Sequence, residues 1–410
     1  MELFARENYL KKIRNFYHTD DLIKVITGVR RCGKSCLMQL VADELLESGV
    51  PEKNIIYIDL DKRGYRSIKT ASELETLIAV HGDRPGLKYL FIDEVQNVSD
   101  FEVVLNGFRN EGGWSIFITG SNSYLLSGEL VTKLTGRYIE FELFPLSFAE
   151  YEEMKRFYEK SILPNPAAEL NQYILEGGFP RTIFFDEMAD KRRYVQGVVK
   201  EIIEKDIRKR IKIRQKETFE RVRKFIINNF GATISLNHLT EELRKNNITV
   251  TTQTVSRYVK ALTDAKILYE CPRFDLKSRK SLSGEQKYYV ADLSFYFAEN
   301  TDNRINYGPI LENLVYIYAR SLDYSVSVGR MGKLECDFIV RSMDMDYAYI
   351  QVAYTIAGNQ ETEDREYRPF EMISDNYPKY LMTMDSLLQK RNGIDHVNLL
   401  DFMMEGKRFD

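Results

Sequence analysis

Short apolar runs alternate with helical patterns over the first 150 residues of the chain. Five of these runs have the length of buried strands, at residues 22–27, 55–58, 89–92, 115–119 and 138–141. After the first run, apolar residues recur at helical spacing up to Gly49, and glycine commonly follows the end of a helix. This alternation predicts an α/β domain, a parallel sheet with helices on both faces.

The middle of the chain shows a different pattern. Two short helical segments joined by a turn, residues 235–243 and 255–262, predict a helix-turn-helix. Three short segments that follow predict the strands of a wing, at residues 267–269, 273–277 and 287–290. With a hairpin tip at residues 281–284, these elements predict a winged helix.

Composition sets outer limits on the function. The 410 residues suffice for about two to three domains. The chain is 44% hydrophobic and 29% charged with a net charge of −3, which is typical of a soluble globular protein. No apolar stretch reaches the roughly 18 residues that a membrane span needs, and the N-terminus lacks a signal-peptide pattern, so we expect a cytoplasmic protein without a membrane partner. Neither the four cysteines nor the four histidines form a metal-site or disulfide pattern.

A phosphate-binding loop follows the first predicted strand. The run Gly28-Val29-Arg30-Arg31-Cys32-Gly33-Lys34-Ser35 fills every fixed position of the pattern G-x-x-x-x-G-K-[ST]. These eight residues and Cys36 are the expected ATP-binding segment, in which backbone N–H groups surround the phosphates at a helix N-terminus. Lys34 is expected to reach the β- and γ-phosphates as a catalytic residue, and the Ser35 hydroxyl to ligate Mg²⁺. Cys32 has two possible roles, a small residue that fills the loop or a redox-sensitive thiolate, and the first is favoured.

Two adjacent carboxylates end the third predicted strand. Asp93 and Glu94 follow an apolar run, and ligands of open α/β sheets bind at the carboxyl ends of the strands. This is the pattern of a Walker B motif. Asp93 is therefore a predicted Mg²⁺ ligand, and Glu94 the predicted general base that activates the attacking water.

Three further residues are candidates with open alternatives. Ser121 and Asn122 follow the fourth strand, where they would contact the γ-phosphate, but both are also ordinary turn residues. Arg137 precedes the fifth strand and is a candidate arginine finger for a neighbouring subunit. A structural salt bridge is the alternative role for Arg137.

The order of motifs resembles that of prokaryotic AAA+ family ATPases with a C-terminal nuclease-like domain. Beyond the phosphate loop, the resemblance rests on four runs, at residues 118–121, 134–137, 144–150 and 176–180. It implies a P-loop fold with an additional strand and a homo-oligomer with composite ATP sites. It also implies a role for Arg137 across the subunit interface.

Four domains follow from these patterns. We expect a P-loop ATPase domain at residues 1–150, a helical lid or linker at 151–230, a winged helix at 231–292 and a nuclease-like domain at 293–410. The last of these is α/β and resembles the restriction-endonuclease core.

Basic residues suggest where DNA would bind. Residues 200–224 contain 11 Lys/Arg and five acids, a local charge of +6, which fits either phosphate contacts or a solvated helix face with internal ion pairs. In a DNA-binding winged helix, the second helix would enter the major groove with five exposed side chains, Thr252, Gln253, Ser256, Arg257 and Lys260. Lys277, Arg279 and Lys280 would meet phosphates. Winged helices also serve as lids or protein-docking modules.

The C-terminal third departs from an active nuclease. Glu312 on a predicted helix and Asp337 on a predicted strand match the acidic positions. An active nuclease of this kind also has an acid and a lysine two residues apart in an E-x-K motif. Here Gln351 stands in place of the acid and Ala353 in place of the lysine, so one metal ligand is neutral and the cationic group is missing. A lysine from elsewhere, such as Lys333, is the remaining candidate. We therefore expect a catalytically degenerate domain.

Three functions compete. The leading hypothesis is an Mg²⁺-dependent ATPase that acts as a nucleotide-driven switch or motor on a DNA or protein partner. The alternative is a winged-helix DNA-binding regulator that uses ATP as a ligand, and Glu94 argues against it because pure binding needs no water-activating carboxylate. The third, an ATP-dependent nuclease, is disfavoured by Gln351 and Ala353.

Overall fold

The computed structural model describes residues 2–120, 134, 136–300, 305–358 and 360–409. The chain forms two compact units, Met1–Pro145 with Asp264–Lys266, and Leu146–Thr263 with Ile267–Asp410. No helix within the described ranges combines the length and apolarity needed to cross a membrane.

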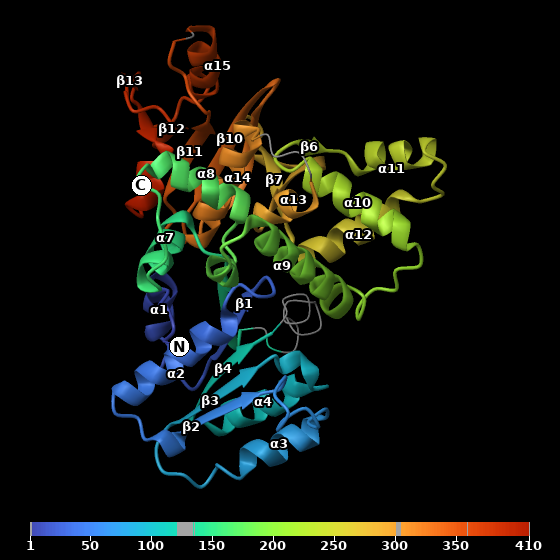
Figure 1. Cartoon of the computed structure of the whole chain (residues 1–410), viewed down its shortest axis with the longest axis vertical. Helices are drawn as coiled ribbons and strands as arrows, with labels where there is room; N and C mark the ends of the chain where they lie inside the picture. Colours follow the sequence, from blue (N-terminus) through green and yellow to red (C-terminus); the bar gives the residue numbers. More distant parts are fainter. Residues whose placement is uncertain (1, 121–133, 135, 301–304, 359, 410) are drawn as a thin grey trace. The chain divides into compact units, whose positions relative to one another are not determined.

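The first unit is built on five parallel strands in the order β2-β3-β4-β1-β5 (Figure 1). The strands are β1 (Ile23–Gly28), β2 (Ile55–Asp59), β3 (Lys88–Asp93), β4 (Trp114–Thr119) and β5 (Tyr138–Leu143). Its described helices are α1 (Glu7–Arg14), α2 (Lys34–Glu47), α3 (Ala71–Ala79) and α4 (Phe101–Glu111). Each predicted strand is present to within two residues, so the predicted α/β parallel sheet is confirmed.

Alternating side chains of the sheet supply two apolar faces. On one face, strand residues such as Val25 and Ile92 pack with α3 and α4 in a single buried cluster. Side chains alternate along a strand, so their neighbours point to the other face. There Phe91 stacks on Phe117 with ring centroids 4.8 Å apart. Both faces are buried, which explains why the strands read as continuous apolar runs.

The second unit begins with helices. They are α7 (Phe148–Phe157), α8 (Pro166–Glu176), α9 (Met188–Glu201), α10 (Lys216–Asn228), α11 (Leu236–Lys245), α12 (Thr252–Asp264) and α13 (Ser294–Glu299), followed later by α14 (Tyr307–Ser321), α15 (Gln360–Glu371) and α16 (Leu399–Met404). A six-residue π-helix, Ile202–Ile207, continues α9. The glycines after α8 allow close packing, because a Cβ at Gly177 would collide with Asp292 and one at Gly178 with the Leu146 carbonyl.

A nine-stranded sheet joins the rest of this unit, in the order β13-β14-β12-β11-β10-β9-β7-β8-β6. The strands are β6 (Thr233–Ile234), β7 (Leu268–Asp275), β8 (Lys280–Val290), β9 (Ser325–Met331), β10 (Leu334–Arg341), β11 (Tyr347–Val352), β12 (Lys379–Thr383), β13 (Lys390–Arg391) and β14 (Ile394–Asn398). Strands β10, β11 and β12 lie side by side in Figure 1. Because β7 pairs with β9, the sheet continues across the domain boundary predicted at residues 292 and 293.

The wing hairpin turns earlier than predicted. Residues 268–275 form one strand, with an irregularity near Pro272, which cannot donate a ladder hydrogen bond. The turn occupies residues 276–279 instead of 281–284. The Asp275 carboxylate accepts a hydrogen bond from the Ser278 N–H at 2.6 Å, and Arg279 has φ of 54°. An aspartate that closes its own turn explains the shift.

Candidate functional site

The phosphate loop links β1 to α2 through an unusual backbone. Gly28 and Gly33 have φ of 145° and 108°, and a Cβ at Gly28 would collide with the Leu143 carbonyl. Arg31 also has positive φ, 71°. These conformations let the backbone curl into a cradle in front of α2, where N–H groups and the helix dipole favour an anion.

Lys34 and Ser35 begin α2 from that cradle. The Lys34 side chain is buried and its Nζ donates to the carbonyls of Gly28 at 3.0 Å and Val29 at 3.2 Å. The ammonium is thus held over the loop that surrounds the phosphates in P-loop proteins. Ser35 is exposed at the first turn of α2, the position from which its hydroxyl is predicted to ligate Mg²⁺.

The two cysteines of the segment differ in exposure. Cys32 is fully buried, and burial raises the pKa of its thiol. Cys32 therefore fills the loop, and the alternative of a reactive thiolate is not supported. Cys36 is exposed, and its thiol pKa is raised by partial burial and by the negative charge of Asp93. That interaction shows that the third strand ends close to α2.

Asp93 and Glu94 are fixed by one hydroxyl that sequence reasoning missed. Thr119, the last residue of β4, donates its Oγ1 hydrogen to the Asp93 carboxylate. The same oxygen accepts a hydrogen bond from the Glu94 N–H at 3.1 Å. Since Thr119 and Asp93 are both buried, this pair of bonds sets where the acidic residues stand. A threonine at the end of the strand between the loop strand and the acid strand is the signal that could have identified it.

Glu94 is held in a specific orientation. Its backbone has φ of 57°, a left-handed conformation that costs a non-glycine residue about 1 kcal/mol or more. Gln96 Nε2 donates to the Glu94 carboxylate, which is half-buried. A strained backbone and a side-chain partner are typical of a carboxylate whose position matters to chemistry.

Arg6 is a second residue without a motif signal. Its buried guanidinium donates to the carbonyls of Phe144 at 2.7 Å and Cys32 at 3.4 Å. It therefore ties the phosphate loop to the chain that leaves β5. Only the tertiary structure brings these segments together, since Arg6 and Phe144 are 138 residues apart.

Arg137 lies at the opposite edge of the sheet. Its carbonyl accepts a hydrogen bond from the N–H of Ile23, the first residue of β1, at 2.9 Å. The phosphate loop leaves the other end of β1, about 20 Å away at roughly 3.3 Å per residue. The exposed guanidinium makes no ion pair with any residue that the structure describes. Ser121 and Asn122 lie outside the described residues.

A carboxylate cluster with two buried and two half-buried members occupies the C-terminal part of the second unit. We use this name for Glu312 on α14, Glu335 and Asp337 on β10, and Glu366 on α15. Lys287 from β8 pairs with two of them, its Nζ lying 2.8 Å from Glu335 and 3.3 Å from Glu312. Arg273 also lies 3.9 Å from Glu335, and Arg365 lies 2.8 Å from Glu366. Lys333, the candidate from the sequence, is instead exposed in the turn before β10. Lys287 comes from a strand of the predicted wing, and no local sequence pattern indicates that it lies beside these carboxylates.

The donor set of the carboxylate cluster does not fit a metal ion. Gln351 accepts from the Asp337 N–H at 3.3 Å and donates to Glu366 at 3.0 Å, while the Val352 N–H donates to the Asp337 carboxylate at 2.9 Å. Burial raises the pKa of Asp337 and of Glu312. Among the described residues, no three His, Cys, Asp or Glu side chains are placed to hold a metal. This arrangement favours the degenerate interpretation.

The basic segment at residues 200–224 spans several secondary-structure elements. It covers the end of α9, the π-helix, a loop and the start of α10. Several of its cations form ion pairs three or four residues apart, namely Lys205–Glu201, Arg208–Glu204, Arg221–Glu217 and Arg223–Glu220. Much of this segment is therefore a solvated helix face.

The side chains proposed for DNA contact are mostly exposed. On α12, Thr252 is half-buried, and the other four are exposed, namely Gln253, Ser256, Arg257 and Lys260. Lys277, Arg279 and Lys280 are exposed at the hairpin. Their contact with DNA stays a prediction.

Lys287→Met tests the role of the buried cation. The variant removes the ammonium that pairs with Glu312 and Glu335, so we expect the free energy of unfolding to fall by about 3–5 kcal/mol in urea titrations. The matched control Lys333→Met removes an exposed charge and should change it by less than about 0.5 kcal/mol. A loss below about 1 kcal/mol in Lys287→Met would mean that the carboxylates do not need this counter-charge.

Thr119→Val tests the hydroxyl between the two acids. The shape is kept but both hydrogen bonds are lost, so we expect ATP turnover to fall about 10- to 100-fold. Equilibrium titration should show a change in ATP affinity of less than about threefold, because no residue of the phosphate loop is altered. Ser115→Ala at the other end of β4 is the control, and its turnover should match the wild type. Unchanged turnover in Thr119→Val would exclude the positioning role.

Family models match two segments of the chain. An AAA domain matches residues 20–152 and a domain of unknown function, DUF8612, matches residues 167–303. A Walker-type ATPase of Pyrococcus abyssi has a similar structure, with a TM-score of 0.52 and 15% identity over 72% of this chain and 95% of that chain. At this identity the likeness shows the fold alone.

Two relatives match most of the sequence. An uncharacterized protein of Haemophilus influenzae is 32% identical over 405 residues, 98% of this chain and 99% of the relative. An uncharacterized protein of Methanocaldococcus jannaschii is 30% identical over 363 residues, 85% of this chain and 78% of the relative. The chain therefore belongs to the family of these two proteins, and its first unit is a P-loop domain of the AAA type.

Proposed function

We propose that the protein hydrolyses ATP with Mg²⁺ and acts as a nucleotide-driven switch on DNA. The observation that carries the ATPase proposal is the joint fixing of Asp93 and Glu94 by Thr119, beside a complete phosphate loop. A protein that only bound ATP would not need a second acidic residue whose backbone N–H is held by Thr119 and whose carboxylate is held by Gln96.

Each residue has a role in this proposal. The loop N–H groups and Lys34 bind the phosphates and offset charge that develops on the γ-phosphoryl group. Ser35 and Asp93 fit the oxygen ligands that Mg²⁺ prefers, and the ion supplies charge neutralisation between phosphates when bound. Glu94 orients the attacking water and accepts its proton, while Gln96 keeps the carboxylate in place.

We also propose that Arg137 serves the ATP site of a second copy of the chain. It is about 20 Å from its own loop along β1, farther than an arginine side chain reaches. An exposed guanidinium without an ion pair among the described residues is available to a neighbour. Such a finger stabilises charge in phosphoryl transfer.

The second unit is proposed to engage DNA. Helices α10, α11 and α12 with the β7–β8 hairpin have the element order of a winged helix, and α12 presents exposed polar side chains. In this role α12 would lie in the major groove. In this proposal the carboxylate cluster would support the fold, since Lys287 and Gln351 bind its carboxylates.

The ATPase proposal is tested with wild-type protein and Glu94→Gln. We expect Glu94→Gln to keep ATP affinity and to lose turnover at least about 100-fold, whereas Lys34→Ala loses ATP binding. Glu111→Gln, an exposed acid at the end of α4, is the matched control and should hydrolyse at the wild-type rate. Stimulation of turnover by duplex DNA, absent in Glu94→Gln, would support the DNA partner.

Two outcomes would overturn parts of this proposal. Wild-type turnover in Glu94→Gln would remove the general-base role. Tight ATP binding without hydrolysis by the wild type would favour the alternative, a DNA-binding regulator with ATP as a ligand.

Arg137→Ala tests the shared site. Alone, this variant and Glu94→Gln should both be nearly inactive. When mixed in equal amounts, about a quarter of the sites regain an intact Glu94 and a neighbour's Arg137, so activity should reappear. Arg109→Ala, at the same edge of the sheet, is the control and should stay active alone. Absence of recovery, with turnover per subunit independent of protein concentration, would contradict a role between subunits.

A further inference from the structure

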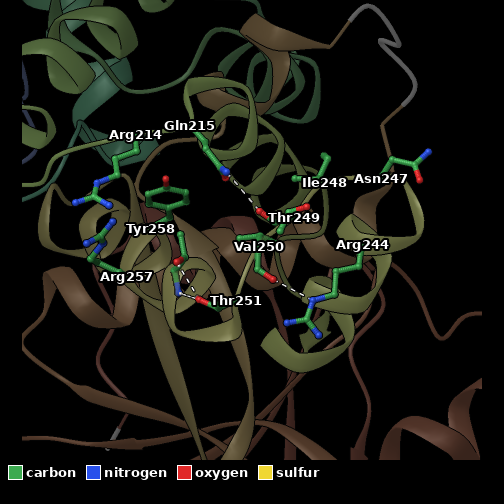
Figure 2. Close-up of a pocket in the computed structure, with 11 residues that line it drawn as sticks. Arg214, Gln215, Arg244, Asn247, Ile248, Thr249, Val250, Thr251, Arg257 and Tyr258 are labelled. Atoms are coloured by element: carbon green, nitrogen blue, oxygen red, sulfur yellow. Dashed lines mark hydrogen bonds between the residues drawn. The ribbon is translucent and has the colours of Figure 1, made fainter.

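A pocket of about 850 Å³ opens beside the N-terminus of α12 in the second unit (Figure 2). Three segments line it: the loop before α10, the end of α11 with the turn that follows, and the start of α12. The lining residues with polar or charged side chains are Arg214, Gln215, Arg244, Asn247, Thr249, Thr251, Thr254, Arg257 and Tyr258. No carboxylate belongs to this lining.

The charge of this arginine pocket is uncompensated. Arg214, Arg244 and Arg257 come from the three different segments and are all exposed. None of them forms an ion pair with a carboxylate in the described part of the chain. Nearby cations behave differently, since Arg208 and Arg221 pair with glutamates on their own helices. Three unpaired guanidinium groups around one cavity form a site for an anion.

The pocket is organised before any ligand binds. Arg244 Nε donates to the Val250 carbonyl at 2.9 Å, which fixes the guanidinium and leaves its terminal N–H groups available. The Thr251 hydroxyl accepts from the Thr254 N–H at 3.2 Å and thereby caps the 13-residue helix α12. Gln215 Nε2 donates to the Thr249 carbonyl at 3.4 Å and links the loop before α10 to the turn (Figure 2). A capped helix start adds a favourable dipole for an anion.

The lining points to phosphate groups instead of an acidic peptide. Protein interfaces usually contain aromatic or methionine anchors. Among the described residues, the exposed large apolar side chains all lie outside residues 164–342. Around the pocket, the neighbours Gln253 and Ser256 on α12 are exposed and polar, as groups that contact nucleic acid are. Guanidinium forks, hydroxyls and a helix N-terminus are the usual partners of a DNA backbone.

We propose that the arginine pocket binds the sugar–phosphate backbone of duplex DNA and so fixes α12 against the groove. This inference rests on the proposed function, in which DNA is the partner of the second unit, and it names the residues that hold it. Phosphate contacts carry no base information, so Arg214 and Arg244 contribute affinity independent of sequence.

The test measures binding of a fluorescein-labelled 20-base-pair duplex to the full-length protein by anisotropy at several salt concentrations. Arg214→Ala, Arg244→Ala and Arg257→Ala should each weaken affinity about threefold to tenfold, and the triple variant about 100-fold or more. The slope of log affinity against log salt should become shallower by about two to three in the triple variant. A duplex of scrambled sequence should show the same losses for Arg214 and Arg244.

A matched triple variant controls for total charge. Lys53→Ala, Lys333→Ala and Arg368→Ala together remove the same charge from exposed positions outside the pocket, and affinity should stay within about twofold. Thermal melting of each variant checks folding. Arg214→Ala keeps the test valid if Arg244→Ala unfolds, because the Arg214 side chain makes no hydrogen bond that holds the described fold together.

Three results would overturn the inference, and each has a separate meaning. If the wild type binds duplex but the triple variant binds equally with the same salt slope, the pocket is wrong while the DNA partner stands. If the wild type hydrolyses ATP but binds no duplex, the DNA partner itself fails. If polyglutamate displaces the duplex at equal charge concentration, an acidic peptide is the occupant.

Discussion

The position of β4 between β1 and β3 is the constraint on which the nucleotide site depends. Parallel strands deliver their carboxyl ends to one edge, so the phosphate loop, Thr119 and the two acids arrive together. With β4 in the middle, a single buried hydroxyl reaches both Asp93 and the backbone of Glu94. Any register shift of β4 by one residue would turn Thr119 to the other face and release both acids.

The second unit depends on a balance between negative and positive charges in its interior. Burying a carboxylate is costly unless a partner compensates it, and β10 carries Asp337 into a nearly solvent-free position. Lys287 supplies a positive charge from another strand, paired with Glu312 and Glu335, and Gln351 bridges Asp337 to Glu366 by hydrogen bonds. These acidic residues are thus held by ion pairs and hydrogen bonds within the fold.

The features that could be predicted were those encoded in adjacent residues. The phosphate loop, the Asp93-Glu94 pair and the five strands follow from local patterns, and the strands appear where expected. Thr119, Arg6 and Lys287 act through contacts between distant segments, which no local pattern specifies. The alternation of Ser325, Val326, Ser327 and Val328 matches strand β9. The hairpin turn predicted at residues 281–284 is wrong because Asp275 closes the turn earlier in the chain.

The parallel pairing of β7 with β9 has a consequence for how the two regions that it joins can evolve. The hairpin of the predicted wing and the strands of the predicted nuclease-like region share one hydrogen-bonded sheet. No break in the sheet therefore separates the two regions. A chain that ended after residue 292 would leave the edge of β7 unpaired and open to aggregation. An exchange of either region between proteins would therefore have to preserve the pairing of β7 with β9.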